Sequence, residues 1–535
     1  MENKPLLFGA IAIVVVITIG LIFRHPPDNN KANAGVFSTN ISGLIEAKTS
    51  ETIELKNGDS YDLTASIVKK SVGNSVVKML AYNGMIPGPL IKVEQGAEVT
   101  LHFNNNTDVD TTIHSHGVRL ENKFDGVPDV TQKEVKPGES FTYKIKFPDE
   151  GMYWYHPHIR EDYAQELGLY GNYLVVPNDP NYWSLVNREV ALFVDDILME
   201  DGKIATYSKE SANRTLMGRF GNTMLVNGET NYSLQAKEGE VIRFYITNSA
   251  NTRTFHISIP GAKMKLVGAD GGKYEHETWS DGVILSPSER TIIEVLFPNA
   301  GSYKLEHKTP ERIYALGTIA VASEKVAISY EKEFAVLRSN KDIQSEIDAF
   351  RPSFNKPADK NLKLTIDMGM QMNGMMQGNT GGHNMHGGGQ MMPNSQMVAS
   401  GDSIEWEEGD SAMMNAMSNP DMMKWVIQDE ETSKKNMDID WKFKVGDKVK
   451  IKITNDPNSM HPMQHPIHFH GQRFLVLSTN GKPNDNLVWK DTTLIQNGDT
   501  VEILVEMTNP GEWMAHCHIA EHLEASMMFG FNVNP

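Results

Sequence analysis

One strand pattern occurs three times in this 535-residue chain, and it restricts the possible folds more than any other feature. In each copy a glycine is followed by apolar residues three, five and seven positions later and by an asparagine nine positions later: Gly96-Val99-Leu101-Phe103-Asn105, Gly239-Ile242-Phe244-Ile246-Asn248 and Gly446-Val449-Ile451-Ile453-Asn455. Strict alternation is typical of a β-strand with one buried face, and we interpret the asparagine as a turn residue. The recurrence predicts three copies of one β-sandwich, and therefore an all-β protein.

Composition and turn signals set the domain boundaries. From about residue 50 apolar and polar residues alternate, and glycine, proline and asparagine mark the turns. The length favours about three or four domains. We predict a tether at 1–34, domains at 50–180, 181–325 and 355–535, a linker at 326–354, and an insert at 368–423 within the third domain.

Histidines gather in four short clusters, each containing a pair spaced i, i+2. The pairs are His114 and His116, His156 and His158, His468 and His470, and His516 and His518, with His465 and His522 beside the last two. Such a pair in a strand points to one face, so it can direct two imidazoles at one metal centre. A single pair is compatible with an ordinary surface strand, but four pairs indicate metal binding. In the middle copy Glu306 and Lys308 hold the matching positions, which predicts a domain without metal ligands.

The single cysteine of the chain lies in the run His516-Cys517-His518, and His522 and Met527 follow shortly after. One thiolate, two imidazoles and a weak thioether are the ligands of a blue copper site, so a second imidazole must come from elsewhere. If this segment is a strand, Cys517 points away from the face that His516 and His518 share. One strand then serves two metal centres, joined by a covalent path of a few bonds.

These motifs resemble the four signatures of the multicopper oxidase family, in the family's order: HSHG at 114–117, HPH at 156–158, HPIHFHG at 465–471 and HCHIAEHLEASM at 516–527. The resemblance implies three cupredoxin-like Greek-key domains and four copper ions. It implies a type 1 copper on His465, Cys517, His522 and Met527, a type 2 copper on His114 and His468, and a type 3 pair on His116, His156, His158, His470, His516 and His518. Because these ligands come from the first and third copies, we expect the trinuclear cluster at the interface of domains 1 and 3.

The resemblance also implies an oxidase that takes electrons singly from a reductant and reduces O₂ to water, with Asp125, Cys517 and His522 taking part in catalysis. We expect the reductant to meet the imidazole edges of His465 and His522. Asp125 matches the family's proton-delivering carboxylate, although an aspartate before a glycine is also typical of a turn. Relatives often carry an acid directly after the second type 1 histidine. This chain has Leu523 there, which leaves its second proton route open.

The insert at 368–423 holds about half of the 29 methionines of the chain. Thioethers are soft ligands that suit Cu(I), so the insert is a candidate collector of cuprous ions. The candidate substrate ligands are Met368, Met370, Met372, Met375, Met376 and Met463. Met463 matches a substrate-ligand position of cuprous-oxidising relatives, whereas the acid that they carry two positions earlier is His461 here. The alternative is an unstructured Gly/Asn/Gln linker that tolerates methionine.

The N-terminus predicts a membrane anchor. Residues 5–23 form an uncharged apolar run, which as a helix rises about 28 Å and crosses the bilayer core. The small residues at 32–34 resemble a signal-peptide cleavage site, so a secreted form is the alternative. The resemblance places the catalytic domains outside the cytoplasm, in the periplasm or at the cell surface. The formal net charge of −18 argues against nucleic-acid binding.

Three functions from different classes fit these features. The first is an oxidase that couples oxidation of Cu(I), phenols or both to reduction of O₂ to water, in copper tolerance. The second is a laccase for organic phenols and amines, with the insert as a lid. The third is a copper-binding protein without catalytic activity, which the complete ligand set disfavours. Fe(II) and Mn(II) are further candidate electron donors.

Overall fold

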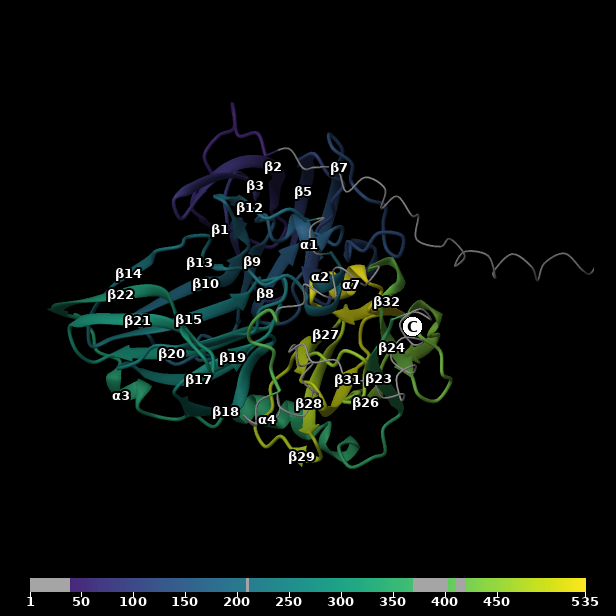
Figure 1. Ribbon diagram of the computed structural model, residues 1–535. Helices are drawn as coiled ribbons and strands as arrows, with labels where there is room; N and C mark the ends of the chain where they lie inside the picture. The colour runs from purple at the N-terminus through teal and green to yellow at the C-terminus, as the bar shows by residue number, and fades with distance from the viewer. Residues whose placement is uncertain (1–38, 208–210, 369–402, 410–419) are drawn as a thin grey trace, which may run out of the picture.

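The computed structural model describes residues 39–207, 211–368, 403–409 and 420–535. Within these residues the strands form three sandwiches of two main sheets each. The first sandwich, purple and blue, lies at the top of Figure 1, the second, teal, at the left, and the third, green and yellow, at the lower right. The prediction of a mostly β chain built from repeated units is confirmed.

The first sandwich pairs a sheet of order β1-β4-β9-β8-β6 with one of order β3-β2-β5-β7. Its strands are β1 (Thr52–Leu55), β2 (Ser60–Val72), β3 (Ser75–Tyr82), β4 (Leu90–Glu94), β5 (Glu98–Asn106), β6 (His114–His116), β7 (Ser140–Lys146), β8 (Gly151–His156) and β9 (Gly171–Val176). The core between the two sheets is apolar and fully buried, with Leu63, Leu101 and Phe103 among its members.

The second sandwich pairs a sheet of order β13-β10-β15-β20-β17-β18 with one of order β14-β22-β21-β16-β19, and β11 and β12 form a small ribbon beside them. Its strands are β10 (Arg188–Ile197), β11 (Met199–Glu200), β12 (Lys203–Ile204), β13 (Thr223–Val226), β14 (Tyr232–Glu238), β15 (Glu240–Asn248), β16 (Phe255–Ser258), β17 (Lys263–Ala269), β18 (Gly272–Ser280), β19 (Val283–Leu285), β20 (Arg290–Phe297), β21 (Gly301–Lys308) and β22 (Ile313–Lys325).

The third sandwich pairs a sheet of order β24-β23-β26-β31-β28-β29 with one of order β25-β33-β32-β27-β30. Its strands are β23 (Lys360–Asp367), β24 (Lys424–Asp429), β25 (Trp441–Lys444), β26 (Lys448–Asn455), β27 (His465–Phe469), β28 (Arg473–Thr479), β29 (Lys482–Pro483), β30 (Thr492–Ile495), β31 (Thr500–Glu506), β32 (Gly511–Cys517) and β33 (Met528–Asn534).

Short helices connect the strands. They are the 3₁₀ turns η2 (Asn122–Phe124), η3 (Arg351–Ser353), η5 (Pro420–Met422) and η6 (Asn436–Asp438), and the helices α1 (Glu161–Ala164), α2 (Ser211–Met217), α3 (Glu331–Phe334), α4 (Lys341–Asp348) and α7 (Ala520–Glu524). Segment 326–354, predicted as a linker, contains α3, α4 and η3, and Ile343, Ile347 and Phe350 pack against Trp489 of the third sandwich. Figure 1 shows α1, α2 and α7 side by side where the three sandwiches meet.

The repeated strand pattern forms equivalent strands in all three copies. It corresponds to β5, β15 and β26, as predicted. In each copy one strand pairs in parallel with this strand and antiparallel with a second strand of the same sheet: β2 with β5 and β3, β10 with β15 and β13, and β23 with β26 and β24. The three sandwiches therefore share a common topology as well as a common sequence pattern.

The repeated asparagine is a buried anchor, so its interpretation as a turn residue is wrong. Asn105, Asn248 and Asn455 are at most 1% exposed. The side-chain amide donates to main-chain carbonyls of two separate loops: Asn105 to Val109 and Val135, Asn248 to Arg253 and Leu285, and Asn455 to Met463, Ile495 and Gln496. Each asparagine thus joins two loops at one end of its sandwich through hydrogen bonds that are shielded from solvent.

The connection between these antiparallel partners differs greatly among the copies. Residues 73–74 join β2 to β3, residues 198–222 with helix α2 join β10 to β13, and residues 368–423 join β23 to β24. The methionine-rich insert therefore stands where the first copy has a tight hairpin turn. Most of it lies outside the described residues, including the candidate ligands Met370, Met372, Met375 and Met376.

The predicted membrane anchor at residues 5–23 also lies outside the described residues. In the part of the chain that the structure describes, no helix is both long and apolar enough to span a bilayer.

Candidate metal centre

Equivalent strands of the first and third sandwiches position the histidine pairs. Only His114 and His116 both lie within a strand, and the second members of the other pairs lie just beyond the strand ends: His158 after β8, His470 after β27 and His518 after β32. In the first sandwich, β6 pairs with β8 so that His114 faces His156. In the third, β27 pairs with β32 so that His468 faces His516. His114 and His468 therefore hold equivalent positions in the two copies.

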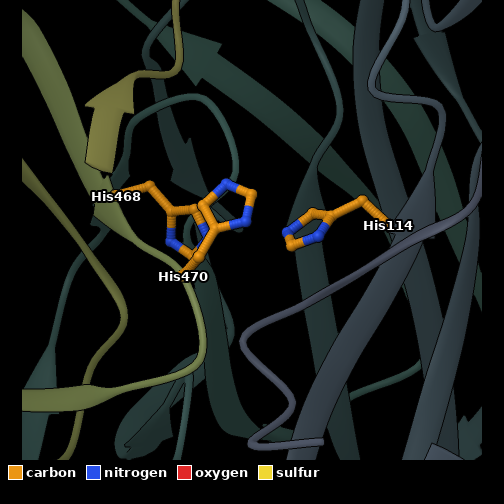
Figure 2. A group of neighbouring side chains, drawn as sticks. All are labelled: His114, His468 and His470. Carbon is orange, nitrogen blue, oxygen red and sulfur yellow. The ribbon is translucent and has the colours of Figure 1, made fainter. Parts of the chain in front are cut away.

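The two sets of histidines meet between the first and third sandwiches. The rings of His116 and His468 stack with centroids 3.7 Å apart, and those of His114 and His470 lie 4.1 Å apart. Figure 2 shows His114 directed from the first sandwich towards His468 and His470 of the third. The eight histidines of the predicted trinuclear cluster are His114, His116, His156, His158, His468, His470, His516 and His518, all at most 9% exposed.

Main-chain carbonyls fix the orientation of four of these rings. Each of the four carries its proton on Nδ1 and donates it to a carbonyl oxygen at 2.8 to 2.9 Å: His114 to Asp125, His156 to Pro157, His468 to Asp491, and His516 to Cys517. This hydrogen bond sets the tautomer and leaves Nε2 with a free lone pair. Binding of the outer nitrogen in this way is typical of metal-ligating histidines.

The inner nitrogens fit a metal cluster. Several are buried without a hydrogen-bond partner, namely Nε2 of His114, His156, His158 and His468, Nδ1 of His116, and both nitrogens of His518. His470 and His516 present their Nε2 atoms to each other at 3.0 Å. Burial lowers the pKa of His156, and also that of His158 and His470, so the imidazoles are neutral, as metal binding requires. Nitrogen lone pairs that are buried, point towards one another and have no hydrogen-bond donor fit the binding of copper ions.

Asp125 lies between two of these histidines. It is 1% exposed, its Oδ2 accepts a hydrogen bond from His470 Nδ1 at 2.9 Å, and its Oδ1 lies 3.3 Å from His114 Nδ1. Gly126, with φ of +83°, allows this placement, because a Cβ there would lie 2.0 Å from the carbonyl oxygen of Ile113. Asp125 thus contacts one histidine of each predicted copper type in the cluster, His470 through its carboxylate and His114 through its main-chain carbonyl.

A second group of donors lies on the other face of β32. Cys517 Sγ is 3.6 Å from His465 Nδ1 and 3.7 Å from His522 Nδ1, and the two nitrogens are 3.2 Å apart. All three residues are fully buried, as is Met527, whose carbonyl oxygen accepts the main-chain N–H of Cys517. Burial raises the pKa of the Cys517 thiol, so a positive metal ion is needed to stabilise the thiolate here. A thiolate and two imidazoles converging at these distances fit a blue copper ion.

The expectation that His465 and His522 meet a reductant at the surface is wrong, because neither side chain is exposed. His522 donates its outer Nε2–H to the carbonyl oxygen of Leu216, in helix α2, at 3.1 Å. The ring of Trp425 covers both histidines, with centroid distances of 4.7 Å to His465 and 4.3 Å to His522. Helix α2 lies in the long connection between β10 and β13, so a part of the middle sandwich covers the Cys517 site.

Residues 403–409, near the end of the methionine-rich insert, are docked beside this site. Gln464, which precedes His465, exchanges two hydrogen bonds of 3.1 Å with the backbone of Glu405. Arg253 of the middle sandwich donates to the carbonyl oxygen of Trp406 at 2.8 Å and pairs with Glu407 at 3.2 Å. Trp406 is only 8% exposed. The insert is thereby anchored to both the second and the third sandwich.

Two of the predicted cuprous ligands fall within the described residues. Met463 is fully buried, two positions before His465, and Met368 is 6% exposed at the start of the insert. Both pack in the same apolar cluster as Cys517. His461 stands next to the ring of Trp425, at a centroid distance of 6.2 Å, and its Nε2 is buried without a partner.

Glu161 is a residue of the centre that the sequence motifs did not reveal. It begins helix α1, is 1% exposed, and has its Oε1 3.4 Å from Nδ1 of His158. Neither carboxyl oxygen accepts a hydrogen bond, and burial raises the pKa of the group well above its usual range. The sequence signal for this residue was its position three residues after His158. Its approach to the cluster depends on Arg160, whose left-handed backbone, with φ of +48°, directs the chain back towards His158.

Three family models, each described as multicopper oxidase, match residues 65–180, 195–312 and 409–535, one in each sandwich. The multicopper oxidase of Staphylococcus haemolyticus is 27% identical over 516 residues, covering 94% of this chain and 95% of that protein. A laccase of Arthroderma benhamiae is 28% identical and covers 83% of this chain and 72% of that protein.

Solved structures share the fold. A multicopper oxidase of Campylobacter jejuni, described as a metallo-oxidase, aligns with a TM-score of 0.66 at 23% identity, covering 94% of this chain and all of that chain. The family models, the relatives and the buried histidine and cysteine donors agree on one class of protein. The chain belongs to the multicopper oxidases, copper-containing oxidoreductases that use O₂ and a reducing substrate.

Proposed function

We propose that this protein is a cuprous oxidase that uses O₂ to oxidise Cu(I) in copper tolerance. Four cuprous ions and four protons are consumed for each O₂, giving four cupric ions and two water molecules. The apolar run at residues 5–23 supports a membrane anchor, and the family resemblance supports a location of the catalytic domains outside the cytoplasm.

The proposal rests mainly on how the Cys517 site is enclosed. A phenol that reduces a blue copper site directly has to approach the edge of a ligand imidazole. Here the outer nitrogen of His522 is bound to Leu216, and the indole of Trp425 covers His465 and His522. An enclosed site favours a small ionic donor, whose electron enters through the hydrogen bond between Leu216 and His522. The adjoining methionines supply soft ligands for such a donor.

The copper assignment follows the converging donors. We assign a type 1 copper to His465, Cys517 and His522 with Met527, a type 2 copper to His114 and His468, and a type 3 pair to His116, His156, His158, His470, His516 and His518. When bound, these four coppers accept electrons one at a time and deliver four to O₂. The protein fixes the imidazoles, keeps them neutral and connects the two groups through β32.

Carboxyl groups next to the cluster serve the protons that the reaction consumes. Asp125 is bound to Nδ1 of His470 and is close to His114. Glu161 lies beside a different histidine, His158, and takes the place of the acid that Leu523 replaces. Glu524 lies within electrostatic reach of Glu161 and is exposed, so the two carboxyl groups extend from the solvent to the cluster.

The test is oxygen uptake by the copper-loaded protein with Cu(I) and with a bulky phenol. A matched variant replaces residues 368–423 by Gly-Asn, the turn that joins β2 to β3 in the first copy. We expect the wild-type protein to favour Cu(I), and the shortened variant to lose cuprous turnover and gain phenol turnover. An unchanged visible band of the cysteine-bound copper controls for folding.

The other outcomes separate the alternative functions. A laccase would favour the phenol in the wild-type protein and keep its cuprous turnover after the replacement. A copper-binding protein without catalytic activity would take up copper but consume no oxygen with either reductant. Preference for Fe(II) or Mn(II) over Cu(I) would keep the oxidase but overturn the assignment of its substrate.

A further inference from the structure

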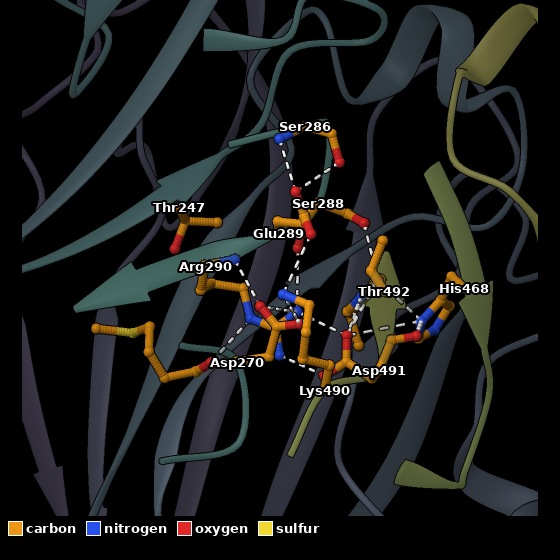
Figure 3. A network of polar contacts seen from close by, with 12 residues as sticks. Thr247, Asp270, Ser286, Ser288, Glu289, Arg290, His468, Lys490, Asp491 and Thr492 are labelled. Carbon is orange, nitrogen blue, oxygen red and sulfur yellow. Dashed lines mark hydrogen bonds and ion pairs between the residues drawn. The ribbon is translucent and has the colours of Figure 1, made fainter. Parts of the chain in front are cut away.

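A buried ion pair joins the middle sandwich to the copper ligands. Arg290, at the start of β20, donates from Nη1 to Oδ1 of Asp491 at 2.7 Å, and its Nη2 donates to Oδ2. Asp491 directly precedes β30 of the third sandwich. The two residues are 1% and 2% exposed, so this contact is shielded from solvent and salt. Figure 3 shows the pair at the centre of a polar network.

Asp491 touches one histidine of each predicted copper type in the cluster. Its Oδ1 accepts a hydrogen bond from Nε2 of His116 at 3.0 Å, and its carbonyl oxygen accepts one from Nδ1 of His468 at 2.8 Å. The hydroxyl of Thr492 lies 3.1 Å from His116 Nε2 and 3.2 Å from His468 Nδ1, and it donates to Oδ1 of Asp491. His116 comes from the first sandwich and His468 from the third.

His116 is oriented differently from the rings that donate to carbonyls through Nδ1. It carries its proton on Nε2, where Asp491 and Thr492 lie, and its Nδ1 is buried without a partner. The carboxylate of Asp491 therefore selects the tautomer that leaves Nδ1 free to bind a metal. The opposite tautomer would place two unprotonated acceptors against each other at 3.0 Å.

The surroundings hold Arg290 in place. Its Nε donates to the carbonyl oxygen of Met152 at 2.9 Å, Nη1 also donates to Ser288, and its main-chain N–H is bound to Asp270. Lys490 forms an ion pair with Asp270 at 3.2 Å, so the negative charge of Asp270 is compensated by a second cation. The guanidinium is thus fixed by contacts to all three sandwiches.

Gly117 leaves room for the ion pair of Arg290 and Asp491 because it has no side chain. It ends the HSHG motif, directly after His116, and has a φ of +80°. A Cβ at this position would lie 2.2 Å from Oδ2 of Asp491 and 2.9 Å from Nη2 of Arg290. The glycine of the motif therefore lets the ion pair approach the backbone beside the histidine ligand.

We infer that Arg290 and Asp491 form a positioning pair for the trinuclear cluster, through which the middle sandwich, without copper ligands of its own, sets the binding orientation of His116 and His468. This inference rests on the copper assignment proposed above. Loss of a partner in the outer shell of a metal site weakens metal binding by about 10- to 100-fold.

The test compares Arg290→Met, Arg290→Lys and Asp491→Asn with a matched control, Arg243→Met. Arg243 is 3% exposed and pairs with the buried Glu294 at 2.8 Å in the same sheet of the middle sandwich, away from the histidines. Copper retention against a chelator, the EPR signal of type 2 copper and the near-ultraviolet band of the type 3 pair are recorded for the full-length protein.

We expect Arg290→Met and Asp491→Asn to retain trinuclear copper about 10- to 100-fold more weakly and to shift the type 2 signal, while the visible type 1 band stays unchanged. Arg290→Lys keeps the charge without the bidentate contact and should fall between these variants and the wild type. The control should lose stability only. The inference is overturned if Arg290→Lys and Arg290→Met bind copper as the control does.

The substrate of the wild-type enzyme does not enter this comparison, so a failure of the cuprous-oxidase proposal leaves the test intact. A wild-type protein without a type 2 signal would overturn the copper assignment and this inference together.

Discussion

At the scale of single residues, we expect the buried Asn248 to contribute measurably to the free energy of unfolding. Its amide donates to the carbonyl oxygens of Arg253 and Leu285, both at 2.8 Å, and its Oδ1 accepts the N–H of Ala250. Replacement by alanine leaves these groups buried without partners, so we expect Asn248→Ala to lower the free energy of unfolding by about 2 to 4 kcal/mol. Urea unfolding followed by tryptophan fluorescence measures the change. The middle copy is chosen because it holds no proposed copper ligand.

Asn222→Ala is the control for this substitution. Asn222 exchanges hydrogen bonds with the backbone of Met199, but it is exposed, so water replaces the lost contacts. A loss below about 0.5 kcal/mol is expected there. Equal effects of the two substitutions would refute the anchoring role of the buried asparagine.

Glu161 is the residue at which we expect proton supply to be most sensitive. Burial raises its pKa, which favours the protonated form that can donate a proton beside His158. Glu161→Gln preserves the shape and removes the acid, and we expect it to lower kcat by about 100-fold. The visible type 1 band and the copper content should stay unchanged. Asp162→Asn, at a half-buried neighbour paired with Arg160, is the control. Wild-type turnover in Glu161→Gln would contradict the role.

At the scale of elements, the strand position that holds Cys517 in the third sandwich holds a different residue in the middle one. His307 pairs with Ile257 in the middle sandwich, as Cys517 pairs with Ile467 in the third, so the two side chains hold equivalent places. Nδ1 of His307 accepts the main-chain N–H of His256 at 3.0 Å, and burial lowers the pKa of His307 to about 3. The middle copy has kept the strand, and uses this position for packing instead of a thiolate ligand.

The segment 403–409 is an element whose attachment can be measured. Trp406 is buried against the middle sandwich, with its ring 5.9 Å from that of His307. Glu405, Glu407 and Glu408 are the only glutamates of the insert, so a glutamyl endopeptidase reports selectively on this anchor. We expect Trp406→Ala to be cleaved there about 10-fold faster or more, because local opening becomes easier.

Mass spectrometry of the fragments identifies these cuts. Trp279→Ala, which removes a tryptophan that is 48% exposed in the middle sandwich, should leave the cleavage rate unchanged. If Trp406→Ala is cleaved at the wild-type rate, the docked segment does not depend on its indole.

At the scale of the whole molecule, the copper-free protein should become less stable in mild acid. Burial lowers the pKa of nine of the ten proposed histidine ligands, to about 4 for His516 and about 3 for His522. An unfolded histidine titrates near 6.5, so below that pH the unfolded chain binds more protons than the folded one. Stability is therefore complete above about pH 6.5 and falls as the pH drops towards 4.

Each histidine that the folded protein keeps neutral adds to this loss, at most on the order of 1 kcal/mol per pH unit. Denaturant unfolding of the copper-free protein between about pH 7.5 and 5 measures the slope. His307→Gln, which removes a buried histidine outside the proposed ligand set, should reduce the slope. A slope of zero would show that the copper-free centre takes up protons without unfolding.

The sequence predicted the architecture well because the relevant signals are local. Alternation over nine residues specifies β5, β15 and β26, and the paired histidines mark the strands near whose ends the donors lie, although His158, His470 and His518 lie beyond those ends. The enclosure of His522 could not be predicted in this way. It depends on helix α2, whose position comes from the packing of the middle sandwich against the third. Asp491 and Arg290 lie 201 positions apart in sequence, and no local pattern connects them.

The division of ligands between β6, β8, β27 and β32 also governs when the protein can become active during its synthesis. A growing chain holds His114 and His158 long before the strand that contains His516 leaves the ribosome. Every proposed copper site needs at least one residue from the third sandwich, so an incomplete chain has only half-sites. A product that ends before β32 therefore lacks part of the proposed type 1 and type 3 sites and cannot assemble the complete copper centre.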